Sequence, residues 1–258
     1  MDLYYIIILF LLGINLGSFY NVVGYRLPKG ESIVFPPSHC PKCDHQLSML
    51  ELIPIFSYII QLGKCTKCKT KISLFYPFFE LLAGLLFVLA YFIFGFSIEL
   101  FIALIFISMT LIIFISDYLY YIILDEVLIV ASGLLLIGIF FLDGILGVGT
   151  ALFNGAISFS IMFLIKQLGD FIFKKESMGG GDIKLMFVFG LTFGWEMSLI
   201  SIFIASFLGL PLSIIMLYLK NNKDRIIPFG PFLCIAALII LFLKIDINSV
   251  MEFIITHN

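Results

Sequence analysis

The stretch Ile98–Asp117, IELFIALIFISMTLIIFISD, indicates the class of fold. Between Glu99 and Asp117 it holds no charged residue. As a helix rising about 1.5 Å per residue, this uncharged run approaches the roughly 30 Å of hydrocarbon in a bilayer. We therefore expect Ile98–Ser116 to span a membrane, with a carboxylate directly at its end.

The rest of the chain has the same character. Of its 258 residues 62% are hydrophobic and only 12% are charged, about half the charged fraction of a soluble domain. Further apolar runs lie on both sides of the first, so we expect an all-α polytopic membrane protein with about eight transmembrane helices in a lipid bilayer. These runs are Leu3–Tyr25, Tyr76–Phe96, Glu126–Leu142, Val148–Leu168, Ile183–Trp195, Met197–Leu219 and Ile226–Leu243.

One of these runs, Ile183–Trp195, is too short to cross a bilayer. Its 13 residues would span roughly 20 Å as a helix. Either the helix starts earlier, or the segment before it is recessed into the membrane.

The basic residues favour one orientation. If the chain crosses the membrane eight times with its N-terminus outside the cytoplasm, fourteen of its fifteen Lys and Arg residues lie on or beside the cytoplasmic side. The exception is Lys244. Leu3–Tyr25 has no basic segment before it and is long enough to span, so we interpret it as a retained helix. We expect a multi-pass protein of the cytoplasmic membrane with the loop 26–75 in the cytoplasm.

That loop contains two C-x-x-C pairs, Cys40-Pro-Lys-Cys43 and Cys65-Thr-Lys-Cys68. Their separation of 21 residues is close to zinc-ribbon spacing, and four thiolates make a closed tetrahedral zinc site. Metal binding can supply folding free energy that a loop of this size lacks. Disulfides or free thiols are the alternative, although stable disulfides are rare in the cytoplasm. We expect a zinc-ribbon-like module with a structural zinc ion.

Carboxylates at membrane depth are the second group of candidates. An Asp at the centre of a membrane helix costs about 2.5–3.5 kcal/mol on the insertion scale, so such residues usually face a polar cavity and mark function. Asp117 ends one predicted span, Asp125 precedes the next, and Glu80 lies within the second. Asp182 follows the glycines 179–181, which permit unusual dihedrals and close approach of another backbone. A flexible loop with a solvated aspartate is the alternative.

Two aspartates that face one cavity can perform aspartic protease chemistry. One carboxylate deprotonates a water molecule while the other donates a proton to the scissile carbonyl oxygen. The sequence contains neither G-x-S-x-G nor H-E-x-x-H. Two other classes stay open, a transporter or channel with a carboxylate proton relay and a zinc-scaffolded membrane adaptor without catalysis.

The order of several short motifs resembles that of the bacterial type IV prepilin peptidases, or leader peptidases, of the G-x-G-D aspartic class. The resemblance covers most of the chain. Its motifs are Gly17-Ser18-Phe19-Tyr20-Asn21-Val22-Val23, Tyr25-Arg26-Leu27-Pro28, the two cysteine pairs, Ile53-Pro54-Ile55-Phe56-Ser57-Tyr58, Gly63-Lys64-Cys65, Tyr76-Pro77-Phe78-Phe79-Glu80, Asp117-x7-Asp125, Met178-Gly-Gly-Gly-Asp182-Ile-Lys184-Leu185 and Pro228-Phe229-Gly230-Pro231-Phe232.

The resemblance implies an activity and a site. Such enzymes remove the basic leader of prepilins and pseudopilins after a Gly, at the cytoplasmic face of the membrane. Asp117 and Asp182 are then the catalytic pair, and Asp125, Gly179 and Gly181 have supporting roles. The regions become a first helix 1–25, a cytoplasmic zinc module 26–75 and a membrane peptidase domain 76–258. No nucleic-acid partner is expected.

Many members of this family also methylate the new N-terminus with S-adenosylmethionine. The resemblance places Gly63, Lys64 and Glu80 near the site of methyl transfer. The sequence departs from the family at Leu52, where Asn is common, and at Leu124, where Pro is usual. A peptidase that does not methylate therefore stays open as a variant.

Overall fold

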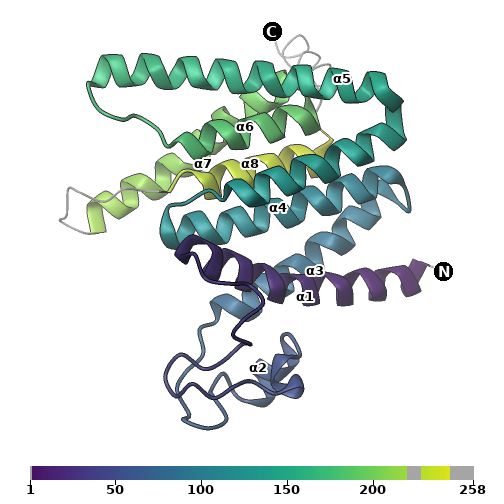
Figure 1. Cartoon of the computed structure of the whole chain (residues 1–258), viewed down its shortest axis with the longest axis vertical. Coiled ribbons are helices and arrows are strands. Elements are labelled where there is room, and N and C mark those ends of the chain that lie inside the picture. Colours follow the sequence, from purple (N-terminus) through teal and green to yellow (C-terminus); the bar gives the residue numbers. More distant parts are fainter. Residues whose placement is uncertain (1, 220–227, 245–258) are drawn as a thin grey trace. The chain divides into compact units, whose positions relative to one another are not determined.

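The structure is a computed structural model that describes residues 2–219 and 228–244 (Figure 1). The chain divides into two compact units, Met1–Phe96 and Ser97–Asn258. The helix that follows residue 75 belongs to the first of these units. The functional roles of the three predicted regions stay predictions.

In the first unit, helices α1 (Asp2–Arg26) and α3 (Phe75–Phe94) pack antiparallel through small residues. A Cβ atom on Gly13 would lie 2.7 Å from the Gly84 Cα, and one on Gly17 would lie 2.9 Å from the Glu80 Cα. Backbones that approach this closely leave no room for larger side chains, as is common between membrane helices. The G-x-x-x-G spacing in α1 therefore joins two helices of one chain.

The loop between these two helices forms a small module with little regular structure. It contains the 3-10 helices η1 (Leu27–Lys29) and η2 (Met49–Leu52) and the short helix α2 (Phe56–Ile60). Two isolated antiparallel bridges, His39 with Gln46 and Lys64 with Lys71, each close one cysteine knuckle.

The second unit consists of longer helices that pack on one another. They are α4 (Ile98–Tyr120), α5 (Asp125–Phe173), α6 (Gly180–Phe193), α7 (Trp195–Leu219) and α8 (Gly230–Leu243). Helix α5 is bent at Gly144, whose φ of 67° suits glycine, and Figure 1 shows its second half turning back on the first. Phe106 of α4 packs against Phe189 and Phe193 of α6 inside this unit.

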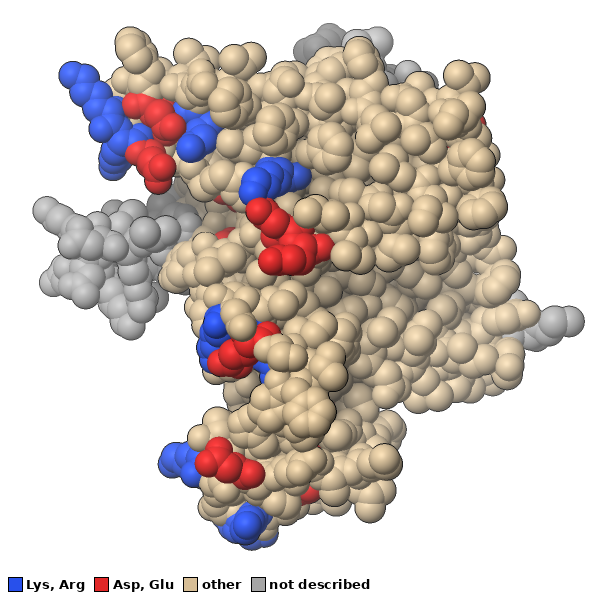
Figure 2. Space-filling model, viewed as in Figure 1, with Lys and Arg blue, Asp and Glu red and all other residues tan. Residues whose placement is uncertain are grey.

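These helices confirm the predicted class of fold. With α5 counted as two segments, each of the eight predicted apolar runs corresponds to a helical segment, although the start of the last run, 226–227, lies outside the described residues. Among the described residues α1, α3, α4 and α5 are long and apolar enough to cross a membrane, and α8 is a shorter apolar helix. The surface in Figure 2 is mostly free of charged side chains, as expected for helices surrounded by lipid.

Candidate functional site

Asp117 lies in the last turn of α4, with only 6% of its surface exposed. Its Oδ2 atom accepts a hydrogen bond of 2.9 Å from the backbone N–H of Gly230. Gly230 is the first residue of α8, and the free N–H groups of a helix N-terminus favour a negative charge. The start of α8 is thus a donor for this carboxylate.

The contact requires glycine at position 230. A Cβ atom there would lie 2.6 Å from the Asp117 Oδ2 and 3.1 Å from its Cγ. Such an atom would displace the carboxyl group and lengthen the hydrogen bond. The motif residue Gly230, which had no predicted role, therefore belongs to the surroundings of Asp117.

Asp182 is the third residue of α6 and is 8% exposed. Gly179 is the N-cap residue of α6, and a Cβ atom there would lie 3.5 Å from the Asp182 Oδ2, so the carboxyl group lies beside the start of its own helix. A Cβ atom on Gly181 would lie 2.7 Å from the Ile123 Cβ, so this glycine permits close packing. Gly180 and Gly181 are helical and the φ of Gly179 is −67°. This segment therefore does not use the unusual dihedrals that glycine permits, and α6 starts three residues before the apolar run does.

The structure brings Asp117 and Asp182 into one neighbourhood of the second unit. The charge of Asp117 acts on Asp182, and the charges of both act on the thiol of Cys234 in α8. Cys234 is 1% exposed. Helices α4, α6 and α8 therefore meet around two buried carboxyl groups, an arrangement in which the two can share a proton.

Asp125 lies at the start of α5 and binds Lys184 of α6. The Lys184 Nζ donates to both carboxylate oxygens of Asp125, at 2.8 and 2.6 Å. About half of each side chain is exposed. The ion pair joins the first residue of α5 to the fifth residue of α6, two residues after Asp182. The structure thus gives Asp125 a contact with the helix that carries Asp182.

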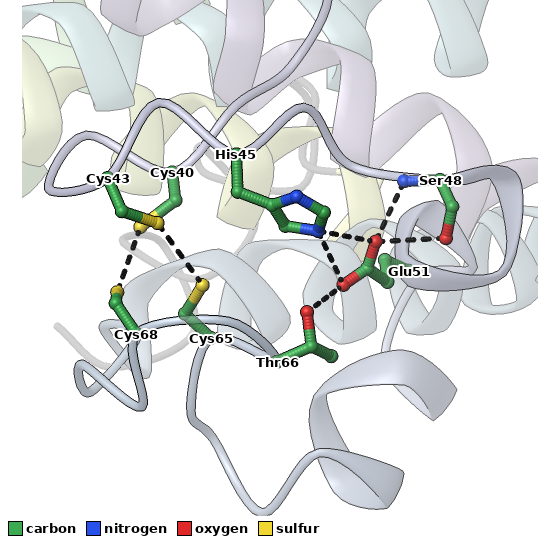
Figure 3. Close-up of polar contacts among 8 residues, drawn as sticks. All are labelled: Cys40, Cys43, His45, Ser48, Glu51, Cys65, Thr66 and Cys68. Atoms are coloured by element: carbon green, nitrogen blue, oxygen red, sulfur yellow. Dashed lines mark hydrogen bonds and ion pairs between the residues drawn. The ribbon is translucent and has the colours of Figure 1, made fainter.

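In the first unit, the four predicted cysteines come together (Figure 3). Their sulfur atoms all lie within 4.8 Å of one another, with 3.7 Å between the Sγ atoms of Cys40 and Cys68 and 3.9 Å between those of Cys43 and Cys65. Four thiolates about 2.3 Å from one zinc ion would be about 3.8 Å apart in a tetrahedron. All four cysteines are free, so the donor set and its spacing fit a metal and not two disulfides.

Glu51 connects the two cysteine knuckles (Figure 3). It accepts hydrogen bonds from the Thr66 hydroxyl and the Ser48 backbone N–H, and it lies 3.3 Å from the His45 Nε2. These contacts, the one with Thr66 foremost, lower the pKa of Glu51 to about 2.

The three residues predicted near methyl transfer lie in the same unit, and two of them contact the segment between the knuckles. Glu80 of α3 is 8% exposed and accepts hydrogen bonds from the Ile55 N–H, at 2.8 Å, and from the Ser18 hydroxyl. Gly63 is buried against Tyr58 and has a φ of 66°. Lys64 is exposed, and no contact is described between it and Glu80.

Asn21 of α1 is a further residue that the sequence did not single out. Its Nδ2 donates to the Tyr76 carbonyl, whereas its Oδ1 is buried and has no hydrogen-bond partner among the described residues. Asn21 and Ser18 are one turn apart in α1, and the residues that they contact, Tyr76 and Glu80, are one turn apart in α3. The two contacts therefore lie on the same face of the packing between these helices. An unpaired buried acceptor next to a buried carboxylate suits a ligand that donates hydrogen bonds.

Four functional contacts were missed at the sequence level: those of Gly230, Lys184, Glu51 and Asn21. One signal was available, because Ser48-x-x-Glu51 is the capping-box pattern that the structure contains. The other three contacts join positions far apart in the chain, or depend on which face of a helix is buried.

Comparisons with known proteins agree with the two-unit structure. Residues 11–94 match the bacterial peptidase A24 N-terminal domain, and residues 104–214 match the type IV leader peptidase family. The prepilin leader peptidase/N-methyltransferase of Bacillus subtilis is 35% identical, over 87% of this chain and 88% of its own length. Proteins of the same name are 32% identical in Pseudomonas aeruginosa and 33% in Legionella pneumophila, each over 90% of this chain and at least 88% of their own. No solved structure matches the chain.

Proposed function

Because the chain belongs to the type IV leader peptidase family, we propose that it cleaves the leader from prepilins or pseudopilins with Asp117 and Asp182 as the catalytic pair. One observation carries this proposal: two carboxyl groups from different helices, distant in sequence, are buried close enough to interact electrostatically. A backbone N–H donates to Asp117, and Asp182 lies in the first turn of α6, where the helix N-terminus favours a negative charge. Cleavage would then need only residues of the second unit.

The proposed chemistry uses no covalent intermediate. The ionised member of the pair takes a proton from a water molecule, whose oxygen attacks the carbonyl carbon of the leader's last Gly. The protonated member donates its proton to the carbonyl oxygen, and the C–N bond breaks when this intermediate collapses and the leaving amine takes up a proton. The Gly230 N–H orients the carboxyl group of Asp117, so this member of the pair is positioned before the substrate arrives.

The proposed location of this reaction is the cytoplasmic face of the plasma membrane. The distribution of basic residues supports an N-terminus outside the cytoplasm and the module 26–75 inside it. Both aspartates would then lie at the inner edge of the bilayer, where a basic leader is accessible and the apolar pilin segment is still in lipid.

For the module we propose a structural zinc ion held by Cys40, Cys43, Cys65 and Cys68. The sulfur spacing and the Glu51 contacts that join the two knuckles support this assignment. All four positions of a tetrahedral ion would be filled by protein, which suits a metal that stabilises the fold.

We also propose methylation of the new N-terminus, as the names of the relatives suggest. S-adenosylmethionine would supply the methyl group. Glu80 and Asn21 offer a buried carboxylate and an unpaired acceptor that can hold an amine and accept its proton. Gly63 and Lys64 would lie on the cofactor side of this site. A peptidase without methylation is the variant to be tested, and the family match argues against a transporter.

A cleavage assay tests the central proposal. The purified full chain is incubated with a synthetic prepilin peptide, and the variants Asp117→Asn and Asp182→Asn are each assayed in the same way. The control variant is Asp143→Asn, which changes an exposed aspartate at the bend of α5. We expect the first two variants to lose cleavage and the third to keep it. Full cleavage by either of the first two would refute the assigned pair.

A further inference from the structure

The segment 52–63 of the zinc module, LIPIFSYIIQLG, carries no charge, although charged residues are frequent before and after it in the loop. It contains α2 and its flanking turns. Many of its apolar side chains, and two from η2 just before it, are exposed. Those most exposed are Met49 at 89%, Leu50 at 76%, Phe56 at 54%, Ile59 at 62%, Ile60 at 80% and Leu62 at 82%. We call these six residues the apolar patch.

A hydrogen bond fixes the depth of this segment relative to α3. The Ile55 N–H donates to the Glu80 Oε2 at 2.8 Å. The Glu80 Cα lies about 7.5 Å along α3 from Phe75, at 1.5 Å per residue, and the Glu80 side chain holds the Ile55 N–H beside the first turns of that helix. If α3 crosses the bilayer, Ile55 lies alongside its first turns and not in the water beyond it.

The backbone at Ile55 is strained in a way that maintains this contact. Ile55 has a φ of 63° and a ψ of −54°, and the Phe56 N–H donates to the Pro54 carbonyl at 2.6 Å. This tight turn is unfavourable for a β-branched residue and persists only where surrounding contacts hold it. It directs the Ile55 N–H towards Glu80, and the apolar patch follows on α2 immediately after it.

The connections of the module keep it near the membrane. Arg26, the last residue of α1, donates to the carbonyls of Ser32 and Pro36, and the chain re-enters the membrane at Phe75. The segment is followed by basic residues, Lys64, Lys67, Lys69 and Lys71, which suit anionic headgroups. An apolar surface next to a basic one is typical of segments that lie in a membrane interface.

From these contacts we infer that the segment 52–63 lies in the lipid–water interface beside α3, with the apolar patch inserted among acyl chains and the following lysines at the headgroups. The apolar patch is thus covered by lipid of the leaflet that α3 enters. Lipid covers side chains that would otherwise be exposed to water. The inference does not depend on the proposed enzymatic activity.

Fluorescence of single-tryptophan variants tests this inference. Trp195 is replaced by Phe, and Ile60→Trp, Leu62→Trp or the control Lys67→Trp is introduced into the full chain with zinc bound. Each protein is reconstituted into vesicles of phosphatidylcholine and phosphatidylglycerol, with or without lipids brominated on their acyl chains. We expect blue-shifted emission from the Ile60 and Leu62 variants and several-fold stronger quenching by brominated lipid than in the control.

Quenching of both variants no stronger than that of Lys67→Trp would overturn the inference. Two other occupants would appear as distinct results. Shielding only after addition of a prepilin peptide would identify a substrate-binding surface, and shielding that depends on protein concentration would identify a contact between two copies of the chain. Zinc content per chain, measured for every variant, shows that the module is folded. Two positions in the patch keep the test decisive if one variant fails to fold.

Discussion

Lys184 binds both oxygens of Asp125, at 2.8 and 2.6 Å, and thereby joins the N-terminal parts of α5 and α6. Asp182 is two residues before Lys184 in the same helix, so the two side chains point to different sides of α6. The contact thus gives Asp125 a role in holding the helix that carries the second catalytic candidate. It does not place Asp125 itself among the reacting groups.

Replacing Asp125 with Asn, or Lys184 with Gln, should slow cleavage moderately. An exposed ion pair contributes up to about 1 kcal/mol, so we expect kcat for a synthetic prepilin to fall by about fivefold or less. The exchanged pair Asp125→Lys with Lys184→Asp should recover part of the loss. A loss as complete as that of Asp117→Asn would instead mean that Asp125 takes part in the chemistry.

Gly230→Ala should nearly abolish cleavage while the protein still folds. The added methyl group would lie 2.6 Å from the Asp117 Oδ2 and displace the carboxyl group. Misplacement of a reacting group by about 1 Å can cost about 100-fold in rate. Gly180→Ala is the matched control, because a Cβ atom there meets nothing within 4 Å. Equal activity of the two variants would show that the Gly230 contact is dispensable.

Glu51→Gln should make the zinc module easier to strip of metal with a chelator. The pKa of Glu51 is lowered from 4.5 to about 2 by its contacts, so the charged form stabilises the folded module. This contribution is fully present above pH 4.5 and is lost as the pH falls towards about 2. The difference in chelator resistance between wild type and Glu51→Gln should therefore persist from neutral pH to about 4.5 and shrink below it.

The matched control for that experiment is Glu31→Gln, which changes an exposed glutamate of the same loop. Zinc ligands also take up protons in acid, so both proteins will release metal at low pH. The comparison between the variants isolates the part that Glu51 contributes. Metal release at neutral pH that is the same in all three proteins would contradict the role of Glu51 in joining the knuckles.

Glu80→Gln should separate methylation from cleavage. The buried carboxylate lies in the first unit, whereas Asp117 and Asp182 lie in the second. Mass spectrometry of the product should show a leader removed at a near-normal rate and an N-terminus that lacks the methyl group. Glu99→Gln, an exposed change at the start of α4, is the control. Loss of cleavage together with methylation would show that Glu80 supports the fold or the peptidase step.

The helices and the cysteine group were predictable because their signals are local. An apolar run of about twenty residues, or a C-x-x-C pair, has the same meaning in most surroundings. The approach of Gly230 to Asp117 could not be predicted, because it joins residues 113 positions apart and depends on how α8 packs. The turn at Ile55 was equally hidden, because no propensity favours a positive φ at isoleucine.

The bend at Gly144 determines on which side of the bilayer all later residues emerge. As one straight helix, the 49 residues of α5 would measure about 74 Å, more than twice the hydrocarbon thickness. With the bend, two shorter helical segments lie against each other, so the chain can cross the bilayer and return between Asp125 and the start of α6. If α5 crossed the bilayer only once, Asp117 and Asp182 would lie on opposite sides of the membrane and could not act on one peptide bond.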